Sequence, residues 1–206
     1  NPDEVQPSVL KGSYQNSPYF HTGSDGAMVF WCPVNGVTTP GSTHPRTELR
    51  ELMTGVNGDT SHNWKPGQFT KSRLMATVAV HRVPSGTLDV CIGQVHQFGN
   101  RPFVILHYKN GTVFARIYNT TNANTALTTL SFGNMALDTK FTYELLISAT
   151  TIHVYVNGVH KTYPIDATWK TQDLYFKAGL YCLDGGTSST DGGEAYFYSL
   201  SLYHGG

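Results

Sequence analysis

Charge of either sign is scarce in this sequence. Charged side chains make up 14% of the 206 residues, and 14 basic residues balance 14 acidic ones, so the formal net charge is zero. Nucleic acids and membrane surfaces attract proteins with a basic excess, so the composition gives no reason to expect either partner. An anionic ligand would have to be bound by a local cluster of basic side chains.

Long apolar runs are also absent. No run approaches the roughly 18 residues that a membrane-spanning helix needs, so we expect no membrane span. Helical periodicity is scarce, and the chain contains neither an internal repeat nor an interdomain linker. The 12 tyrosines, 10 phenylalanines and 3 tryptophans supply enough apolar area for a packed core, which argues against disorder. We therefore expect residues 1–206 to form a single domain, most simply a monomer.

Cysteine is limited to Cys32, Cys91 and Cys182. No two of them form a C-x-x-C pair, so the sequence predicts no zinc or redox motif. Their odd number allows two arrangements, which are one disulfide with one free thiol, or three buried thiols.

The sequence is rich in period-two alternation of apolar and polar residues, the pattern of half-buried β-strands. Two Asn-Gly pairs, at 110–111 and 157–158, predict hairpins, because a type I′ turn needs positive φ at both central residues. Strands are expected at 27–31, 46–53, 72–81, 90–96, 103–109, 112–118, 141–148, 151–156, 159–163, 174–181 and 195–203, with one short helix around 57–64 or 168–173. This pattern predicts an all-β fold, a two-sheet antiparallel β-sandwich or jelly roll.

The first candidate site segment lies at 46–50. As a strand it places Arg46, Glu48 and Arg50 on one face, because alternate residues of a strand point the same way. Two arginines could bind a carboxylate in two places each, with Glu48 orienting them. The alternative is a solvated face with ordinary ion pairs.

The second segment places Gln94 and His96 on one face, with Val95 pointing into the core. An amide donor beside an imidazole could hold a carboxylate and accept a proton. A polar sheet face with a surface histidine is the simpler interpretation.

The third segment, 174–181, places Tyr175, Lys177, Gly179 and Tyr181 on one face. Tyrosines can stack on sugar rings and a lysine can pair with an acid group, so the face suits a sugar groove. The alternative is a half-buried strand with a polar outer side. The three segments together supply anion donors, an amide, an imidazole and a phenol, which proton abstraction next to a carboxylate would need.

These three segments resemble the signature motifs of the alginate lyases of polysaccharide lyase family seven, and they occur in the family's order. The stretches 32–39 and 197–202 are also similar to that family, so the resemblance runs from about residue 27 to the end. It implies a β-jelly roll with a concave substrate groove and catalysis without a metal or other cofactor. The sequence departs from the family pattern at 182–184, which puts sugar contacts at one end of the groove in doubt.

The resemblance implies that Arg46, Gln94, His96 and Tyr181 are catalytic. It further indicates Arg50 and Lys177 as substrate-binding residues, and we place Glu48 and Tyr175 beside them. Arg46 and Gln94 would hold the uronate carboxylate while the C5 proton is removed, and Tyr181 would protonate the leaving C4 oxygen. Tyr181 would also be the base for mannuronate, and neutral His96 the base for guluronate.

Substrate preference and location follow from the same resemblance. Val95 occupies a position where valine is loosely associated with mannuronate preference, so we predict mannuronate-rich blocks. The expected partner is alginate, an anionic polysaccharide, and the expected location is extracellular. Two N-x-Thr sequons, at 110–112 and 119–121, add weak support for secretion.

Three other functions remain open at this point. A lyase for another polyuronate, such as glucuronan, could use the same groove. A non-catalytic carbohydrate-binding module or lectin would need the aromatic face but not Gln94, His96 and Tyr181 together. A glycoside hydrolase would need two carboxylates flanking the bond, and Glu48 is the only acidic residue placed on this face.

Overall fold

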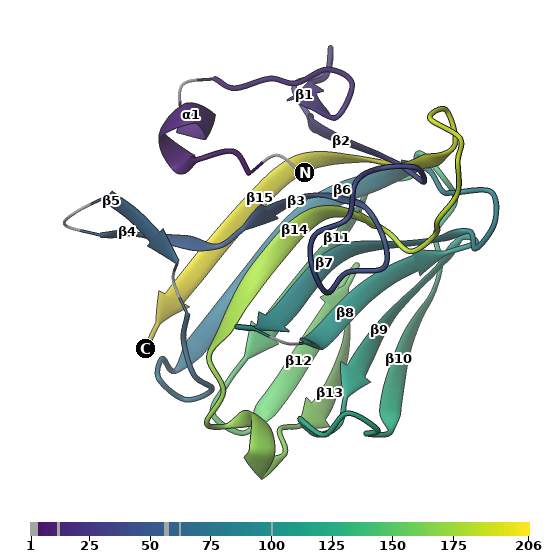
Figure 1. Cartoon of the computed structure of the whole chain (residues 1–206). Coiled ribbons are helices and arrows are strands. Elements are labelled where there is room, and N and C mark those ends of the chain that lie inside the picture. Colours follow the sequence, from purple (N-terminus) through teal and green to yellow (C-terminus); the bar gives the residue numbers. More distant parts are fainter. Residues whose placement is uncertain (1–3, 12, 56–57, 62, 100) are drawn as a thin grey trace.

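The computed structural model describes residues 4–11, 13–55, 58–61, 63–99 and 101–206, and within them almost all regular structure is β-strand (Figure 1). The exceptions are a one-turn helix α1 (Pro7–Lys11) and a 3₁₀ turn η1 (Ala167–Trp169). None of the helices in this described part has the length and apolar character needed to cross a membrane. The predicted all-β class is confirmed.

Two antiparallel sheets form the body of the fold. The seven-stranded sheet runs in the order β1 (Phe20–Thr22), β2 (Met28–Pro33), β15 (Gly192–Gly205), β6 (Lys71–Arg82), β11 (Phe141–Ile147), β12 (Thr151–Val156) and β13 (Val159–Pro164). The six-stranded sheet runs in the order β10 (Leu127–Asn134), β9 (Thr112–Tyr118), β8 (Pro102–Lys109), β7 (Asp89–Gln97), β14 (Leu174–Cys182) and β3 (Arg46–Arg50). This is the predicted two-sheet jelly roll.

The core lies between the two sheets because each sheet turns alternate side chains toward the other. On the seven-stranded side, Phe30 and Phe197 meet edge to face with ring centroids 5.2 Å apart. On the six-stranded side, Phe103 stacks on Trp169 of η1 at 4.4 Å. Large aromatic rings thus fill the layer behind the strands that carry the candidate site.

Both predicted Asn-Gly hairpins are confirmed. Asn110 and Gly111 have φ of 45° and 80° between β8 and β9, and Asn157 and Gly158 have 47° and 79° between β12 and β13. Positive φ at both positions is what the type I′ turn requires. The remaining predicted strands are also present, most with ends shifted by one to three residues.

Two expectations about the segment after β3 are wrong. The predicted strand at 46–53 is interrupted, because β3 ends at Arg50 and a separate strand, β4 (Leu52–Gly55), begins after Glu51. The helix considered for 57–64 is replaced by β5 (Gly58–Ser61), which pairs with β4, although residues 57 and 62 lie outside the described part. The other helix site, 168–173, overlaps η1, while α1, β1 and β10 were not predicted.

Glu51 explains the interruption of the strand. Its backbone N–H donates to the Phe176 carbonyl of β14, and its carboxylate accepts from the Phe176 N–H and from Trp64 Nε1. The same carboxylate contacts His204 near the end of β15. A buried carboxylate needs several such donors, so the chain turns at Glu51 to supply them. The contact also attaches the C-terminal strand to the edge of the site sheet.

Gly179 lets β3 lie close against β14. It adopts φ of 132°, and a Cβ there would lie 2.6 Å from the Thr47 carbonyl oxygen and 2.9 Å from Glu48 Cα. We predict that Gly179→Ala lowers the free energy of unfolding by about 2–4 kcal/mol, because backbone strain and a backbone clash act together. Urea denaturation measures this loss.

Gly185→Ala is the matched control for this prediction. A Cβ at Gly185 would meet no atom within 4 Å, and its φ lies outside the left-handed region. We expect a change below about 0.5 kcal/mol for this variant. Equal stabilities of the two variants would show that the close β3–β14 approach does not depend on the glycine.

Candidate active site

Strand pairing brings the three sequence segments side by side in the six-stranded sheet. β14 lies between β3 and β7, with Lys177 opposite Arg50 on one side and Gln94 on the other. Tyr175 lies opposite His96, and Tyr181 opposite Arg46. All eight predicted site residues therefore lie on three adjacent strands.

The opposite face of these strands is apolar, as the alternation predicts. Val95, Phe176, Ala178 and Leu180 are all buried in the core between the sheets. Thr47 also turns away from the polar face, and its hydroxyl donates to the Trp31 carbonyl of β2. The polar side chains of the three segments thus share the other face of the sheet.

Glu48 is the centre of the polar cluster. Its carboxylate, whose side chain is 2% exposed, accepts from Lys177 Nζ at 2.6 Å, Gln94 Nε2 at 2.5 Å and Arg46 Nη1 at 3.3 Å. Burial by itself would raise the pKa of Glu48, but the charges of Lys177 and Arg46 and the hydrogen bonds outweigh it and hold that pKa below its usual value. Glu48 is therefore ionised and fixes three donors at once.

Tyr181 lies beneath the Arg46 guanidinium, whose central carbon is 4.3 Å from the ring centroid. Ser42 connects the two residues, because its Oγ accepts from Arg46 Nη2 at 2.6 Å and lies 3.3 Å from the Tyr181 hydroxyl. The Ser42 hydroxyl itself donates to the His44 carbonyl, so the phenol is the donor in its contact with Ser42. The ring of His44 packs near Tyr181 at 6.0 Å.

His96 is held as a neutral imidazole. Burial lowers its pKa to about 4, with a further lowering from the charge of Lys177, against the bond to the Gln97 carbonyl. Nδ1 lies 2.7 Å from that carbonyl oxygen, which assigns its proton to Nδ1. Nε2 is then the nitrogen that carries the lone pair.

Arg50 is supported by aromatic rings. Its guanidinium carbon lies 3.9 Å from the Tyr175 ring and 5.7 Å from the Phe98 ring, and Nη2 donates to Asn63 Oδ1 at 2.9 Å. The Tyr175 hydroxyl lies 3.3 Å from His96 Nδ1, which links this end of the cluster to the imidazole. Burial raises the pKa of Tyr175, so it is a neutral phenol.

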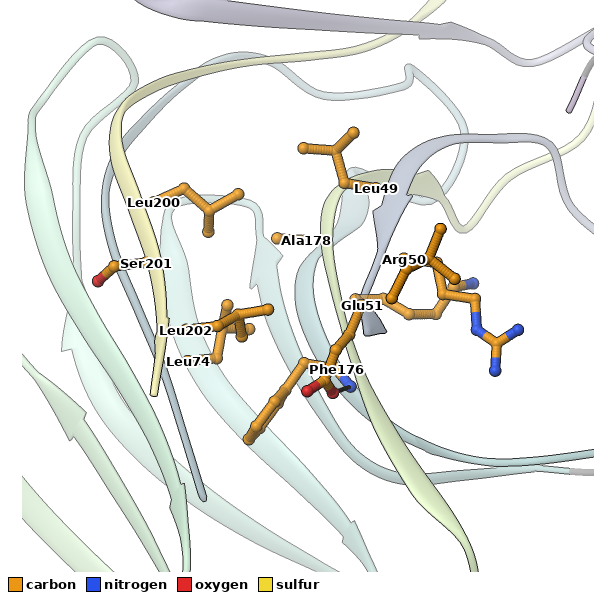
Figure 2. A pocket seen from close by; sticks show the side chains of 11 residues that line it. Leu49, Arg50, Glu51, Leu74, Phe176, Ala178, Leu200, Ser201 and Leu202 are labelled. Atoms are coloured by element: carbon orange, nitrogen blue, oxygen red, sulfur yellow. Dashed lines mark hydrogen bonds between the residues drawn. The ribbon is translucent and has the colours of Figure 1, made fainter. Parts of the chain in front are cut away.

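A separate apolar pocket of about 300 Å³ lies on the other side of β3 and β14 (Figure 2). Leu49 and Ala178 line it from these strands, and Leu74, Leu200 and Leu202 line it from the opposing sheet. The Arg50 side chain points away from the leucines in Figure 2. The pocket belongs to the space between the sheets, and it contains no group suited to bind an acidic sugar apart from residues already engaged.

The part of the chain that the structure describes contains no set of side chains suited to bind a metal ion. Among the residues that the structure describes, no group of three or more His, Cys, Asp or Glu side chains is placed to hold a metal ion. The expectation of cofactor-free catalysis stays a prediction.

Four residues of this face were missed by the sequence analysis. Ser42 and His44 lie in the turn before β3, Asn63 lies after β5, and Phe98 follows β7. All four come from outside regular strands, where alternation carries no information. The only available signal was their position next to segments that were already identified.

The comparisons with known proteins agree with this geometry. A protein-family model described as "Alginate lyase" matches residues 1–204. The chain belongs to the alginate lyase family. The predicted resemblance and the predicted enzyme class are thereby confirmed.

Solved structures and a curated relative support the assignment. A crystal structure of an alginate lyase from Pseudomonas aeruginosa matches 97% of this chain and 91% of its own, with 33% identity and a TM-score of 0.88. Alginate lyase A1-II′, a member of polysaccharide lyase family 7, matches 98% and 90%, with 28% identity and a TM-score of 0.89. A curated alginate lyase from Klebsiella pneumoniae is 26% identical over 98% of this chain and 83% of its own.

Replacement of Glu48 tests the importance of its buried charge. Because its pKa is lowered in the folded chain, ionised Glu48 stabilises the fold above the ordinary glutamate pKa of about 4.3, and this contribution is lost as the pH falls through the folded-state value. We predict that Glu48→Gln lowers the free energy of unfolding at neutral pH by about 3–5 kcal/mol, because Lys177 loses its counter-charge. Stability of the variant should also depend less on pH in the acid range.

The control is Glu144→Gln on the seven-stranded sheet. Glu144 pairs with Arg73 through two bonds of 2.7 and 2.9 Å, and both side chains are more exposed than those of Glu48 and Lys177. We expect a loss of no more than about 1 kcal/mol for this partly solvated pair. Similar losses for both variants would contradict a special role for Glu48.

Proposed function

We propose that the chain depolymerises alginate by β-elimination at 4-linked uronates, leaving oligosaccharides with an unsaturated end. The observation that carries the proposal is the joint placement of Arg46, Gln94, His96 and Tyr181 around the Glu48 cluster on one sheet face. Two solved structures of variants of the family 7 alginate lyase A1-II′ are described as complexes with a product (GGG) and with a substrate (GGMG), which supports the same substrate class.

Stabilising the developing enolate is the first requirement of this reaction. The C5 proton of a uronate is a very weak acid, and removing it pushes negative charge onto the carboxyl group. Donors that are already oriented stabilise such charge without reorganising during the reaction. We assign Arg46 and the second N–H of Gln94 to the carboxylate, since the first N–H of Gln94 is used by Glu48.

Proton transfer is assigned to His96 and Tyr181. With a pKa of about 4, His96 is unprotonated at neutral pH and can accept the C5 proton of guluronate at Nε2. Tyr181 can donate its phenolic proton to the departing C4 oxygen. In mannuronate the proton and the leaving oxygen lie on the same side of the ring, so Tyr181 serves there as both base and acid.

Arg50, Lys177 and Tyr175 are assigned to substrate binding. Arg50 is held by rings and an amide, and Lys177 by Glu48, so neither has to be ordered when an acidic sugar arrives. Glu48 takes part by orienting these donors. We further propose that the protein acts outside the cell, where a polymeric substrate has to be met, and that it acts there as a monomer.

Two other functions are distinguished by simple assays. A lyase for another polyuronate would cleave a glucuronan in preference to alginate in a substrate panel. A carbohydrate-binding module would bind alginate without producing unsaturated ends. The combination of an acid, a base and hydrogen-bond donors for the substrate carboxylate favours a lyase. A binding module needs none of the proton-transfer groups.

Replacing the phenol tests the role of Tyr181. We predict that Tyr181→Phe folds normally and loses about 10²–10⁴-fold in kcat on alginate, the range typical for a lost general acid or base. Formation of unsaturated ends is followed by ultraviolet absorbance. Tyr203→Phe is the control, because Tyr203 is half exposed on β15 of the other sheet. Wild-type activity of Tyr181→Phe would refute the assignment.

Replacing the imidazole tests the two-base scheme. We predict that wild type prefers mannuronate blocks and that His96→Ala loses at least about 10²-fold on guluronate blocks, with a smaller loss on mannuronate blocks. Wild-type kcat/KM on guluronate blocks, which reports the free enzyme, should decline only as the pH falls toward about 4, because the base has to be neutral.

His153→Ala is the matched control for the imidazole. His153 lies on β12 of the other sheet, and burial lowers its pKa as well. This variant should cleave both block types like wild type. Equal losses of His96→Ala on the two block types would rule out a separate base for guluronate. Faster wild-type cleavage of guluronate blocks would overturn the predicted preference, for which buried Val95 could act only through packing.

A further inference from the structure

The three cysteines do not lie on the same side of the six-stranded sheet. Cys182 belongs to the core cluster between the sheets, together with Leu180 of the same strand. Cys91 lies between Val90 and Ile92, which both belong to that cluster, so strand alternation turns its side chain to the opposite face. The thiol of Cys91 donates to the Gly93 carbonyl at 3.4 Å. The sheet itself therefore separates Cys91 from Cys182.

Cys32 faces Cys182 from the other sheet. It lies on β2, where Phe30 and Cys32 belong to the same core cluster, as does Val34 just after the strand. Both cysteines are almost fully buried, at 1% exposure for Cys32 and 0% for Cys182. Strand alternation therefore leaves Cys32 and Cys182 as the one pair, of three possible pairs, whose side chains both point into the core.

The two sheets approach each other closely at this place. Gly193 of β15 is the cross-strand partner of Cys32, and a Cβ on Gly193 would lie 2.6 Å from Val90 Cγ1 and 2.7 Å from Leu180 Cδ2. Val90 is in turn the cross-strand partner of Cys182. Cys32 and Cys182 each lie beside this close approach, one from each sheet.

The Cys32 thiol lies 4.0 Å from the Pro33 carbonyl oxygen, and the two thiols are close enough to change each other's acidity. The interaction with Cys182, followed by burial, raises the pKa of the Cys32 thiol, and the interaction with Cys32 lowers the pKa of Cys182. A thiol whose pKa is lowered by a neighbouring donor is the better nucleophile of the two. Burial raises the pKa of Cys91, which has no such neighbour to activate it.

We propose that Cys32 and Cys182 are oxidised to a disulfide that joins the two sheets directly behind Tyr181. The structure holds the reduced form of the pair. The oxidant is a small disulfide such as oxidised glutathione, present while the chain folds. The Cys182 thiolate attacks it and releases one glutathione thiolate, and the Cys32 thiolate then displaces the second. Two protein thiols are oxidised and one external disulfide is reduced to two thiols.

The cross-link closes a loop of about 150 residues, which includes β3, β7 and most of β14. It removes conformations from the unfolded chain and fixes the end of β14, one residue after the phenol of the candidate site. We expect the disulfide to raise Tm by about 5–10 °C, given the size of the chain. Cys91 remains a free thiol on the opposite face.

Thiol counting after oxidative refolding tests the proposal. The full chain is refolded in a glutathione redox buffer, denatured, and titrated with a thiol reagent before and after reduction. One thiol before reduction and three after it are expected, and peptide mapping under non-reducing conditions should join the peptides that contain Cys32 and Cys182. Three thiols before reduction, or a link that involves Cys91, would overturn the proposal.

Single variants separate the disulfide from general effects of the substitutions. Cys91→Ala should show no free thiol after oxidative refolding and the same fall in Tm on reduction as wild type. Cys32→Ala should have two free thiols and a Tm that does not respond to reductant. If Cys32→Ala fails to fold, Cys182→Ala and the peptide map of the wild-type chain decide the question. A Tm of Cys32→Ala or Cys182→Ala that falls on reduction as much as that of wild type would contradict the pairing.

Discussion

The candidate site depends on one buried carboxylate. Removing the charge of Glu48 from water is unfavourable by several kcal/mol, and only close, well-oriented donors offset it. Lys177, Gln94 and Arg46 supply them from three different strands, so satisfying Glu48 fixes the relative positions of β3, β14 and β7. The same contacts fix the orientation of the three groups that are proposed to bind the acidic sugar. Stability of the cluster and readiness for the substrate therefore have the same physical origin.

Buried carboxylates hold β3 in place on both of its faces. Glu48 engages the polar groups on one side, while Glu51, just past the strand, accepts from Trp64 Nε1 and the Phe176 N–H on the other. The contact of Glu51 with His204 attaches the C-terminal strand β15 to this edge. A short edge strand would otherwise be weakly held, because it pairs with only one neighbour. Two buried carboxylates thus keep Arg46 and Arg50 on a rigid support.

Side-chain alternation was enough to predict which residues share the polar face. It worked for β3, β7 and β14 because one face of each strand is buried in the core, and burial fixes the alternation. It could not predict Ser42, Asn63 or Phe98, which reach the face from turns and segments without a repeating pattern. The break at Glu51 was also missed, since it arises from donors on β14 and beyond β5 that are distant in the sequence. Alternation likewise could not predict which cysteines lie close together, because that depends on where the two sheets approach each other.

Binding an acidic sugar and keeping the base neutral have opposing requirements, and the basic side chains around His96 help to reconcile them. Bound uronate carboxylates would favour the protonated imidazole of His96 and raise its pKa. In the unliganded protein, burial and then Lys177 have already lowered that pKa to about 4. Because that pKa starts from about 4, a rise to about 6 still leaves most of His96 neutral near pH 7. In the proposed reaction, the positive charge of Lys177 attracts the acidic sugar and also favours the unprotonated imidazole. The lysine that Glu48 positions would then support binding and proton abstraction together.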